Sequence, residues 1–156
     1  MPLLQIMEVT HTGGVMERQI DYQAIFKRIP AVMVALSPDF TILDVSDETA
    51  ELTGRKAEDL IGRDVFDTFR PNPNDSREPG PRNLRESLES VLATGERDVM
   101  PLTRYDLEDP GRPGVFDERY WDIVNIPVMA DGHVSQIIFR AMEMTHLIRA
   151  ALRMNC

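Results

Sequence analysis

The side chains of this sequence that could catalyse a reaction or hold a metal ion are few and far apart. The three histidines are His11, His133 and His146, and no two of them stand at the spacing of metal ligands. The only cysteine is Cys156, so no nucleophile can be paired with a base. The sequence also lacks G-x-S-x-G, P-loop, H-E-x-x-H and Rossmann motifs. We therefore expect a protein that is not an enzyme and has no metal site.

A second set of side chains could bind a small molecule without reacting with it. Alternation along the expected strands brings three polar and two large apolar side chains onto one buried face: Thr103, Tyr105, Asn125, Trp121 and Phe139. An apolar surface with a few hydrogen-bonding groups is typical of a ligand pocket. The same groups could instead belong to a filled core, bonded to the backbone and to water. The sequence leaves both interpretations open.

The strand that carries Trp121 and Asn125 is expected over residues 116–128. Glu118 and Asp122 fall on the same parity and should face water, which turns Trp121 toward a core. An Asp131-Gly132 turn follows and leads into another apolar run, so the pattern predicts an antiparallel hairpin.

Four more strands are expected from short apolar or β-branched runs, at residues 31–36, 41–45, 99–106 and 134–140. On the second of these, Asp44 marks the wet face and leaves Leu43 and Val45 on the dry face. On the third, Arg104 and Asp106 should point outward.

Helices are expected over residues 15–29, 47–53, 56–61, 64–69, 83–94 and 146–154. The proline-rich residues 70–81 should form a loop, and Asn83 should cap the helix that follows. On the first helix, the apolar stripe that starts at Tyr22 should face the core. Met16 and Ile20 form a second stripe, which suggests a second subunit.

Elements in this order predict an α+β fold, with a five-stranded antiparallel sheet and helices on one face. The sequence resembles the PAS family over about residues 21–145. The resemblance is carried by AVMVALSPDFTILDVSDETAELTGRKAEDLIGRDVF early in that range and by ERYWDIVNIPVMADGHVSQIIFRAMEMT at its end. It implies a PAS domain at 21–145, an arm and flanking helix at 1–20, and the start of an output helix at 146–156.

PAS domains are sensory or dimerisation modules, often upstream of histidine kinases in two-component systems, and their pocket lies between the sheet and a helical belt. The resemblance therefore implies a candidate ligand pocket formed by Val34, Leu36, Leu43, Val45, Phe66, Leu88, Thr103, Tyr105, Trp121, Ile123, Asn125 and Phe139. The alternative is a ligand-free dimerisation or protein-interaction scaffold in which these residues are plain core.

Many PAS domains end in an Asp-X-Thr motif that joins the last strand to the output helix. Glu143-Met144-Thr145 stands at that position, with an acid one methylene longer, so the resemblance assigns signal output to Glu143 and Thr145. Dimerisation is expected through apolar stripes that include Met16, Ile20, Leu147 and Ala151.

The sequence identifies no cofactor. Flavin photochemistry in PAS domains uses a cysteine of the helical belt, whereas Cys156 lies outside the domain. Haem PAS domains commonly use a histidine of the longer helix, and residues 83–94 contain none. We expect neither haem nor cysteinyl-flavin photochemistry, while non-covalent flavin stays open.

The net charge of −9, with no basic cluster, argues against binding to nucleic acid or to an anionic membrane. No apolar run approaches the roughly 20 residues of a membrane span, and the single cysteine suggests a reducing compartment. We expect a cytoplasmic protein, either free-standing or part of a longer receptor. Its expected partners are a second copy of itself, a histidine kinase or other signalling protein, and an unidentified small molecule.

Overall fold

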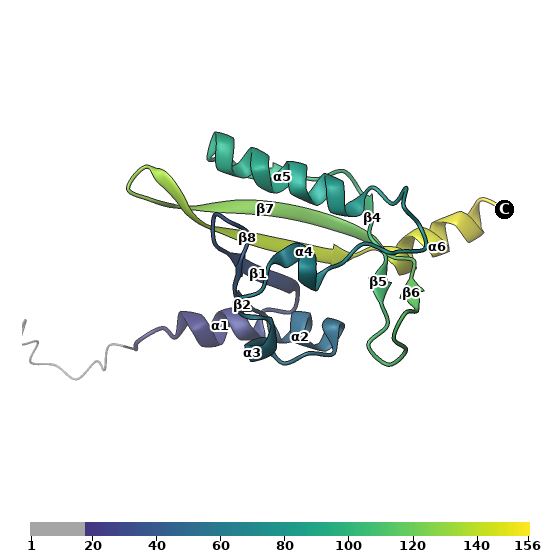
Figure 1. The fold of residues 1–156 in the computed structure, drawn as a ribbon, viewed down its shortest axis with the longest axis horizontal. Coiled ribbons are helices and arrows are strands. Elements are labelled where there is room, and N and C mark those ends of the chain that lie inside the picture. Colours follow the sequence, from purple (N-terminus) through teal and green to yellow (C-terminus); the bar gives the residue numbers. More distant parts are fainter. Residues whose placement is uncertain (1–17) are drawn as a thin grey trace, which may run out of the picture.

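The computed structural model describes residues 18–156, which form a main antiparallel sheet in the order β2, β1, β8, β7, β3, with β4 also paired to β7 (Figure 1). Its strands are β1 (Val32–Leu36), β2 (Ile42–Val45), β3 (Asp98–Val99), β4 (Thr103–Arg104), β7 (Tyr120–Ala130) and β8 (His133–Glu143). A separate hairpin consists of β5 (Leu107–Glu108) and β6 (Phe116–Asp117). The helices are α1 (Tyr22–Arg28), α2 (Asp47–Thr53), α3 (Ala57–Leu60), α4 (Val65–Thr68), α5 (Gly80–Thr94) and α6 (Thr145–Met154).

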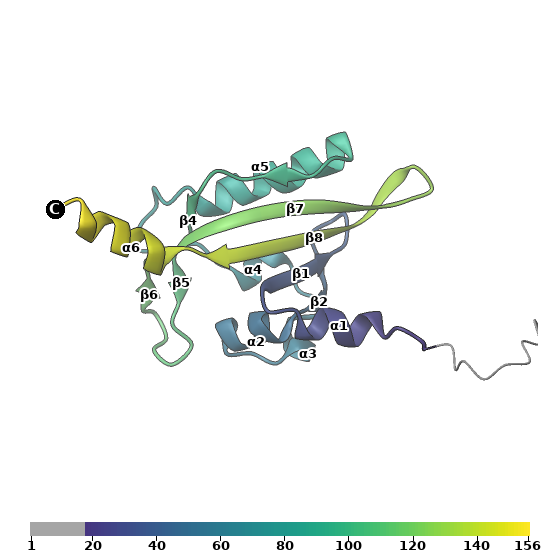
Figure 2. The same cartoon turned by 180° about the vertical axis from the view of Figure 1, so that it is seen from behind.

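This arrangement confirms the predicted α+β fold, because β3 and β4 share one edge of β7 and act as the fifth strand of the sheet. Figure 2 shows α5 lying along β7 and α6 leaving the sheet at the end of β8.

The hairpin of β7 and β8 is the longest pairing in the sheet, running from Trp121 opposite Glu143 to Ala130 opposite His133. Its turn holds Asp131 and Gly132 at φ angles of 51° and 80°. Glycine adopts such angles without steric cost and aspartate tolerates them, so the Asp-Gly pair selects this turn. The predicted hairpin is confirmed.

The strand expected over residues 116–128 is divided in two. Phe116–Asp117 pairs with β5, whereas β7 begins at Tyr120 and pairs with β4 and β8. Three consecutive charged residues, Asp117 to Arg119, interrupt the alternation at the division, and the chain changes partner there.

The strand expected over residues 99–106 is also divided, into β3 and β4. Pro101 lies between them and has no N–H to donate to the ladder with β7. Thr103 and Tyr105 are buried, as predicted. The prediction that Asp106 points outward is wrong, because its side chain is enclosed by hydrogen-bond partners and the residue is 1% exposed.

Leu43 corrects the prediction for the second strand. In the pairing of β1 with β2, Ala35 lies opposite Asp44 but Leu36 lies opposite Ile42, so Leu43 is the extra residue of a β-bulge. The bulge turns both Ile42 and Val45 into the core and leaves Leu43 40% exposed. Strict alternation would place Leu43 inside, and the bulge breaks that alternation.

The first helix is shorter and more exposed than predicted. It begins after Asp21, whose side chain accepts a hydrogen bond from the Ala24 N–H at 3.0 Å. Tyr22 is 74% exposed, so the stripe that starts there does not form core. Instead, Lys27 of α1 forms an ion pair with Asp44 at 2.5 Å, which fixes the helix to the edge strand β2. Residues 15–17, and Met16 with them, lie outside the described residues.

Helix α5 begins earlier than the predicted cap, Asn83, whose backbone N–H already donates to Pro79 O at 2.9 Å inside the helix. Gly80 permits this early start because it touches β4 and the residue after it. A Cβ at Gly80 would lie 2.6 Å from the Tyr105 ring and 2.7 Å from Arg104 O. The predicted end at Gly95, in the left-handed conformation with φ of 67°, is confirmed.

Replacing Gly80 by alanine should therefore destabilise the protein, although alanine normally favours a helix. We expect the free energy of unfolding to fall by about 1–3 kcal/mol, because the methyl group must displace Tyr105 or the backbone. Urea denaturation of Gly80→Ala measures this. Gly111→Ala is the matched control, since Gly111 is exposed and a Cβ there would lie 3.3 Å from its nearest neighbour, Asp109 Oδ1. Equal stability of the two variants would contradict the close approach at Gly80.

Candidate functional site

The inner face of the sheet encloses a small apolar hollow. Its volume is about 20 Å³, close to the space that one water molecule occupies. Four of the predicted pocket residues line it: Tyr105, Trp121, Ile123 and Phe139. The other lining residues come from the sheet, from α2 and α5, and from the segments next to them: Val32, Leu52, Phe69, Leu84, Leu107 and Ala141. The hollow on the inner face is therefore much smaller than the roughly 300–1,000 Å³ of a typical ligand pocket.

The remaining predicted pocket residues do not line this hollow. Six of them are buried elsewhere in the domain: Val34, Leu36, Val45, Leu88, Thr103 and Asn125. Leu43 faces outward because of the bulge. Phe66 is half-buried and packs edge-on against Phe40, with the Arg85 guanidinium 4.0 Å from its ring centre.

The polar groups of the predicted pocket are mostly bonded within the protein. The Tyr105 hydroxyl donates to Phe69 O, and the Thr103 hydroxyl donates to Pro101 O at 2.6 Å. Trp121 Nε1 donates to Tyr105 O at 2.9 Å. Burial raises the pKa of the Tyr105 hydroxyl, and the charge of Glu78 raises it further, which keeps this group a donor. These groups hold the segment after α4 and the segment after β4 against the sheet.

Asn125 differs from the other predicted anchors. Its Nδ2 donates to Ser87 Oγ at 2.8 Å, and Ser87 Oγ donates to Asp98 Oδ2 at 2.5 Å, so a polar chain connects β7, α5 and β3. Within residues 18–156, Asn125 Oδ1 is the buried side-chain polar atom without a hydrogen-bond donor. Water or another small donor would satisfy this oxygen.

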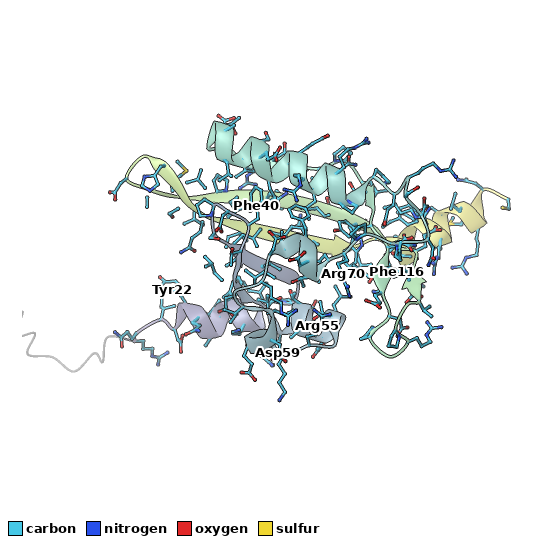
Figure 3. The ribbon with its side chains drawn as sticks, in the orientation of Figure 1. Tyr22, Phe40, Arg55, Asp59, Arg70 and Phe116 are labelled. Carbon is cyan, nitrogen blue, oxygen red and sulfur yellow. The ribbon has the colours of Figure 1, made fainter. Side chains whose placement is uncertain are left out.

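A larger groove of about 320 Å³ lies beside the hollow, between the helical belt and the β5–β6 hairpin. In Figure 3, Arg55 and Arg70 lie on the belt side and Phe116 lies on the hairpin side. Leu52, Phe69 and Leu107 line both the groove and the hollow. These three side chains therefore form the wall between an open site and the closed core.

A third concave region, of about 410 Å³, lies where α2 faces the start of β1 and the end of β8. Glu48, Glu51 and Glu143 surround it, and Trp121 forms part of its floor. Leu52 lines this region too, so one half-buried leucine borders the hollow and both outer grooves.

A buried charged cluster that the sequence analysis missed holds the loop before α5 to the sheet. Arg104 donates to both carboxylate oxygens of Asp106 at 2.9 Å, and Asn72 Nδ2 donates to Asp106 Oδ2 at 2.9 Å. The backbone N–H groups of Asp106 and Asn72 donate to Glu78. The spacing Arg-x-Asp puts Arg104 and Asp106 on one face of an extended segment, and this was the available signal.

The pKa values of the two carboxyl groups in this cluster are shifted in opposite directions. Burial raises the pKa of Asp106, but the hydrogen bonds from Arg104 and Asn72 outweigh burial and hold it below the ordinary value. Burial raises the pKa of Glu78, and the backbone donors offset this only in part. Ionised Asp106 is therefore favoured by folding, whereas ionised Glu78 is opposed by it.

Stability should accordingly respond to pH through Glu78. A raised pKa in the folded state gives a stabilisation that is complete below the unfolded value of 4.5 and is lost as pH rises through the folded pKa. Gln cannot ionise, so Glu78→Gln should gain stability relative to the unaltered protein as pH rises from about 4 to 7. Chemical denaturation at several pH values measures the difference. The exposed Glu96→Gln is the control, and an identical pH profile in both variants would contradict the assignment.

The connection between the sheet and α6 rests on bonds to residues 119–120. Arg119 pairs with Glu143 at 3.2 Å, and the Tyr120 N–H donates to Thr145 Oγ1 at 3.0 Å. The Met144 N–H donates back to Tyr120 O at 2.8 Å. Thr145 is the first residue of α6, its hydroxyl accepts the bond from β7, and α6 has no side-chain cap.

The predicted dimerisation residues differ in what the structure says of them. Ile20 and Leu147 are 57% and 61% exposed, and Ala151 is exposed on α6. Met16 lies outside the described residues.

His133 and His146 are exposed, and residues 18–156 contain no group of three or more His, Cys, Asp or Glu side chains suited to a metal ion. In the same part of the chain, no helix has the length and apolar character needed to cross a bilayer.

Comparison with known proteins agrees with this geometry. The sequence matches the PAS fold family over residues 20–144. No curated protein sequence matches the chain significantly. The fold resembles the PAS domain of a Colwellia psychrerythraea protein, with a TM-score of 0.60 and 14% identity over 80% of this chain and 94% of that one. It also resembles a sensory box sensor histidine kinase from Vibrio cholerae, with a TM-score of 0.53 and 13% identity over 79% and 88%.

A third similar structure is VqmA bound to DPO, with a TM-score of 0.55 and 19% identity over 78% of this chain. This chain spans only 56% of VqmA. Identities this low establish a shared fold and leave ligands and partners to be argued from the residues themselves.

Proposed function

We propose that this chain, which belongs to the PAS fold family, is a non-catalytic sensory module that transmits a conformational change from its inner face to helix α6. The observation that carries the proposal is that Tyr120 and Trp121 are adjacent residues of β7. Trp121 lines the hollow, and Tyr120 before it bonds to Thr145 at the root of α6. A ligand or partner that moves Trp121 would strain the bonds of Tyr120.

The ligand in this proposal is a small molecule that acts at the inner face. Occupation would require Leu52, Phe69 or Leu107 to move, because the hollow of about 20 Å³ is far smaller than the roughly 300–1,000 Å³ of typical ligand pockets. Leu52 and Leu107 are half-buried and border open grooves, so movement of either does not require the sheet to open. The bound DPO of VqmA is an example of a small ligand in a similar structure.

The chain's partners belong to the same proposal. We infer a cytoplasmic protein that acts on a signalling partner such as a histidine kinase, and its net charge of −9 supports a protein partner rather than nucleic acid.

The connection to α6 can be tested by Thr145→Val. The variant leaves the Tyr120 N–H without its acceptor, which costs about 1–3 kcal/mol. Exchange of the hydrogen-bonded Met144 and Ile148 amides at the entry of α6 should therefore accelerate roughly five-fold or more, while exchange in β8 stays unchanged. Hydrogen exchange followed by NMR measures both regions.

Thr94→Val is the matched control for this test. The Thr94 hydroxyl bonds only to Ser90 O and the Glu96 N–H at the exposed end of α5, so removing this hydroxyl should not change amide exchange in α6. Unchanged α6 exchange in Thr145→Val would refute the proposed connection, and uniform acceleration throughout the sheet would reduce Thr145 to a general stabilising residue.

A ligand-free dimerisation scaffold is the second candidate function. The small volume of the hollow favours it, as do the exposed apolar side chains Ile20, Tyr22 and Ile25 at the start of the domain. Isolated exposed apolar residues are ordinary, but three within six residues mark a candidate interface.

The scaffold predicts that Ile20→Asp weakens a dimer. Burying a carboxylate in an apolar interface is unfavourable, so the mass from light scattering should fall from that of a dimer toward that of a monomer. Ile61→Asp is the control, because Ile61 is 45% exposed at the end of α3, on a different element. A monomeric unaltered protein would exclude the scaffold, and an unchanged dimer in Ile20→Asp would remove this segment from the interface.

A further inference from the structure

The groove between the helical belt and the β5–β6 hairpin has an uneven distribution of charge. Arg70 pairs with Glu108 at 3.6 Å, and Asp109 is held by Arg112 at 2.8 Å. Arg55 lines the same groove and is half-buried, and within residues 18–156 its guanidinium forms neither an ion pair nor a hydrogen bond. Among the charged residues that line the groove, Arg55 is therefore the one without an ion-pair partner in residues 18–156.

This charge stands out because the chain carries a net charge of −9. The chain therefore contains many carboxylates, yet none in the described part reaches Arg55. A guanidinium presents a fixed fork of donors that suits a carboxylate. An acidic group that enters the groove would supply the missing partner.

The rest of the groove is suited to the apolar part of such a molecule. Leu52, Phe69, Leu107 and Phe116 line it, and the first three also line the hollow. The β5–β6 hairpin packs closely against Gly54. A Cβ at this position would lie 2.5 Å from Pro110 Cβ, and Gly54 also has a φ of +64°. This contact brings the hairpin close to the end of α2 and closes one side of the groove.

We propose that this groove binds an amphipathic organic carboxylate, with Arg55 holding the carboxylate. The Leu52 side chain separates the groove from the hollow and moves aside to let an apolar tail reach the hollow. The site extends beyond the proposed function, because binding here does not require output through α6.

The test titrates the protein with sodium hexanoate at pH 7 and follows backbone amide and arginine Nε–H signals by NMR. 1-Hexanol and hexylammonium are matched probes, since they keep the tail and change only the head group. Hexanoate should shift the signals of Arg55, Leu107 and Phe116 and should bind at least about ten-fold more tightly than either other probe.

Variants separate the two parts of the site. Arg55→Gln should weaken hexanoate about ten-fold or more, and Arg55→Lys should retain part of the affinity. Arg63→Gln is the control, because Arg63 is exposed, bonds to Asp59 O and does not line the groove. Leu52→Ala should favour octanoate over hexanoate by about four-fold per added methylene, as the longer tail reaches the hollow.

Several outcomes overturn the proposal. It fails if acetate, hexanoate and benzoate all leave the Arg55 signals unchanged, if 1-hexanol binds as tightly as hexanoate, or if Arg55→Gln binds hexanoate like the unaltered protein. These outcomes are independent of the α6 experiment. A carboxylate that binds at Arg55 without altering exchange in α6 supports the groove, and the signalling connection is judged by Thr145→Val.

Discussion

The register of β7 against β8 decides where the informative side chains of this protein point. The ladder starts with Ala130 opposite His133 at the Asp-Gly turn, and an irregularity between Val128 and Met129 shifts the register by one residue, so that Trp121 lies opposite Glu143 at the other end. A slip of one residue would turn Trp121 outward and Asp122 into the core, so burial of one face strongly specifies the register. The same register sets Tyr120 beside Thr145, which ties the entry of α6 to the position of the inner face.

A second constraint comes from charges that are buried together. Asp106 is 1% exposed, and an unpaired carboxylate there would be costly, so Arg104 and Asn72 both donate to it. Arg104 also lies 3.6 Å from Glu118, which accepts a hydrogen bond from the Tyr120 hydroxyl. A continuous set of polar contacts therefore runs from the loop before α5 to the strand residue that holds α6. Its members come from the loop before α5, from β4 and the segment after it, and from the start of β7.

The hollow on the inner face is much smaller than the two grooves beside it. The closed core holds only about 20 Å³, whereas the adjoining grooves hold about 320 and 410 Å³. Leu52 borders all three, and as a leucine on a short helix it can change rotamer at little cost. The well-packed core accounts for stability, and the grooves provide the concave surface on which recognition can occur.

Local patterns in the sequence indicated the order of elements, the Asp-Gly hairpin, the burial of Trp121 and Asn125, and the glycine ends of α2 and α5, since each is marked by a short-range pattern of residue types. Tertiary structure alone decided the rest. The bulge that exposes Leu43, the change of strand partner before Tyr120 and the burial of Asp106 each depend on which segment pairs with which: β1 with β2, β5 with β6, and Asn72 with Asp106. The candidate site itself was missed for the same reason, because Arg55 becomes notable only when folding brings the β5–β6 hairpin to it and leaves it without a carboxylate. Periodicity reports which face of a strand is buried, whereas the shape and charge of a groove arise from what the other elements place around it.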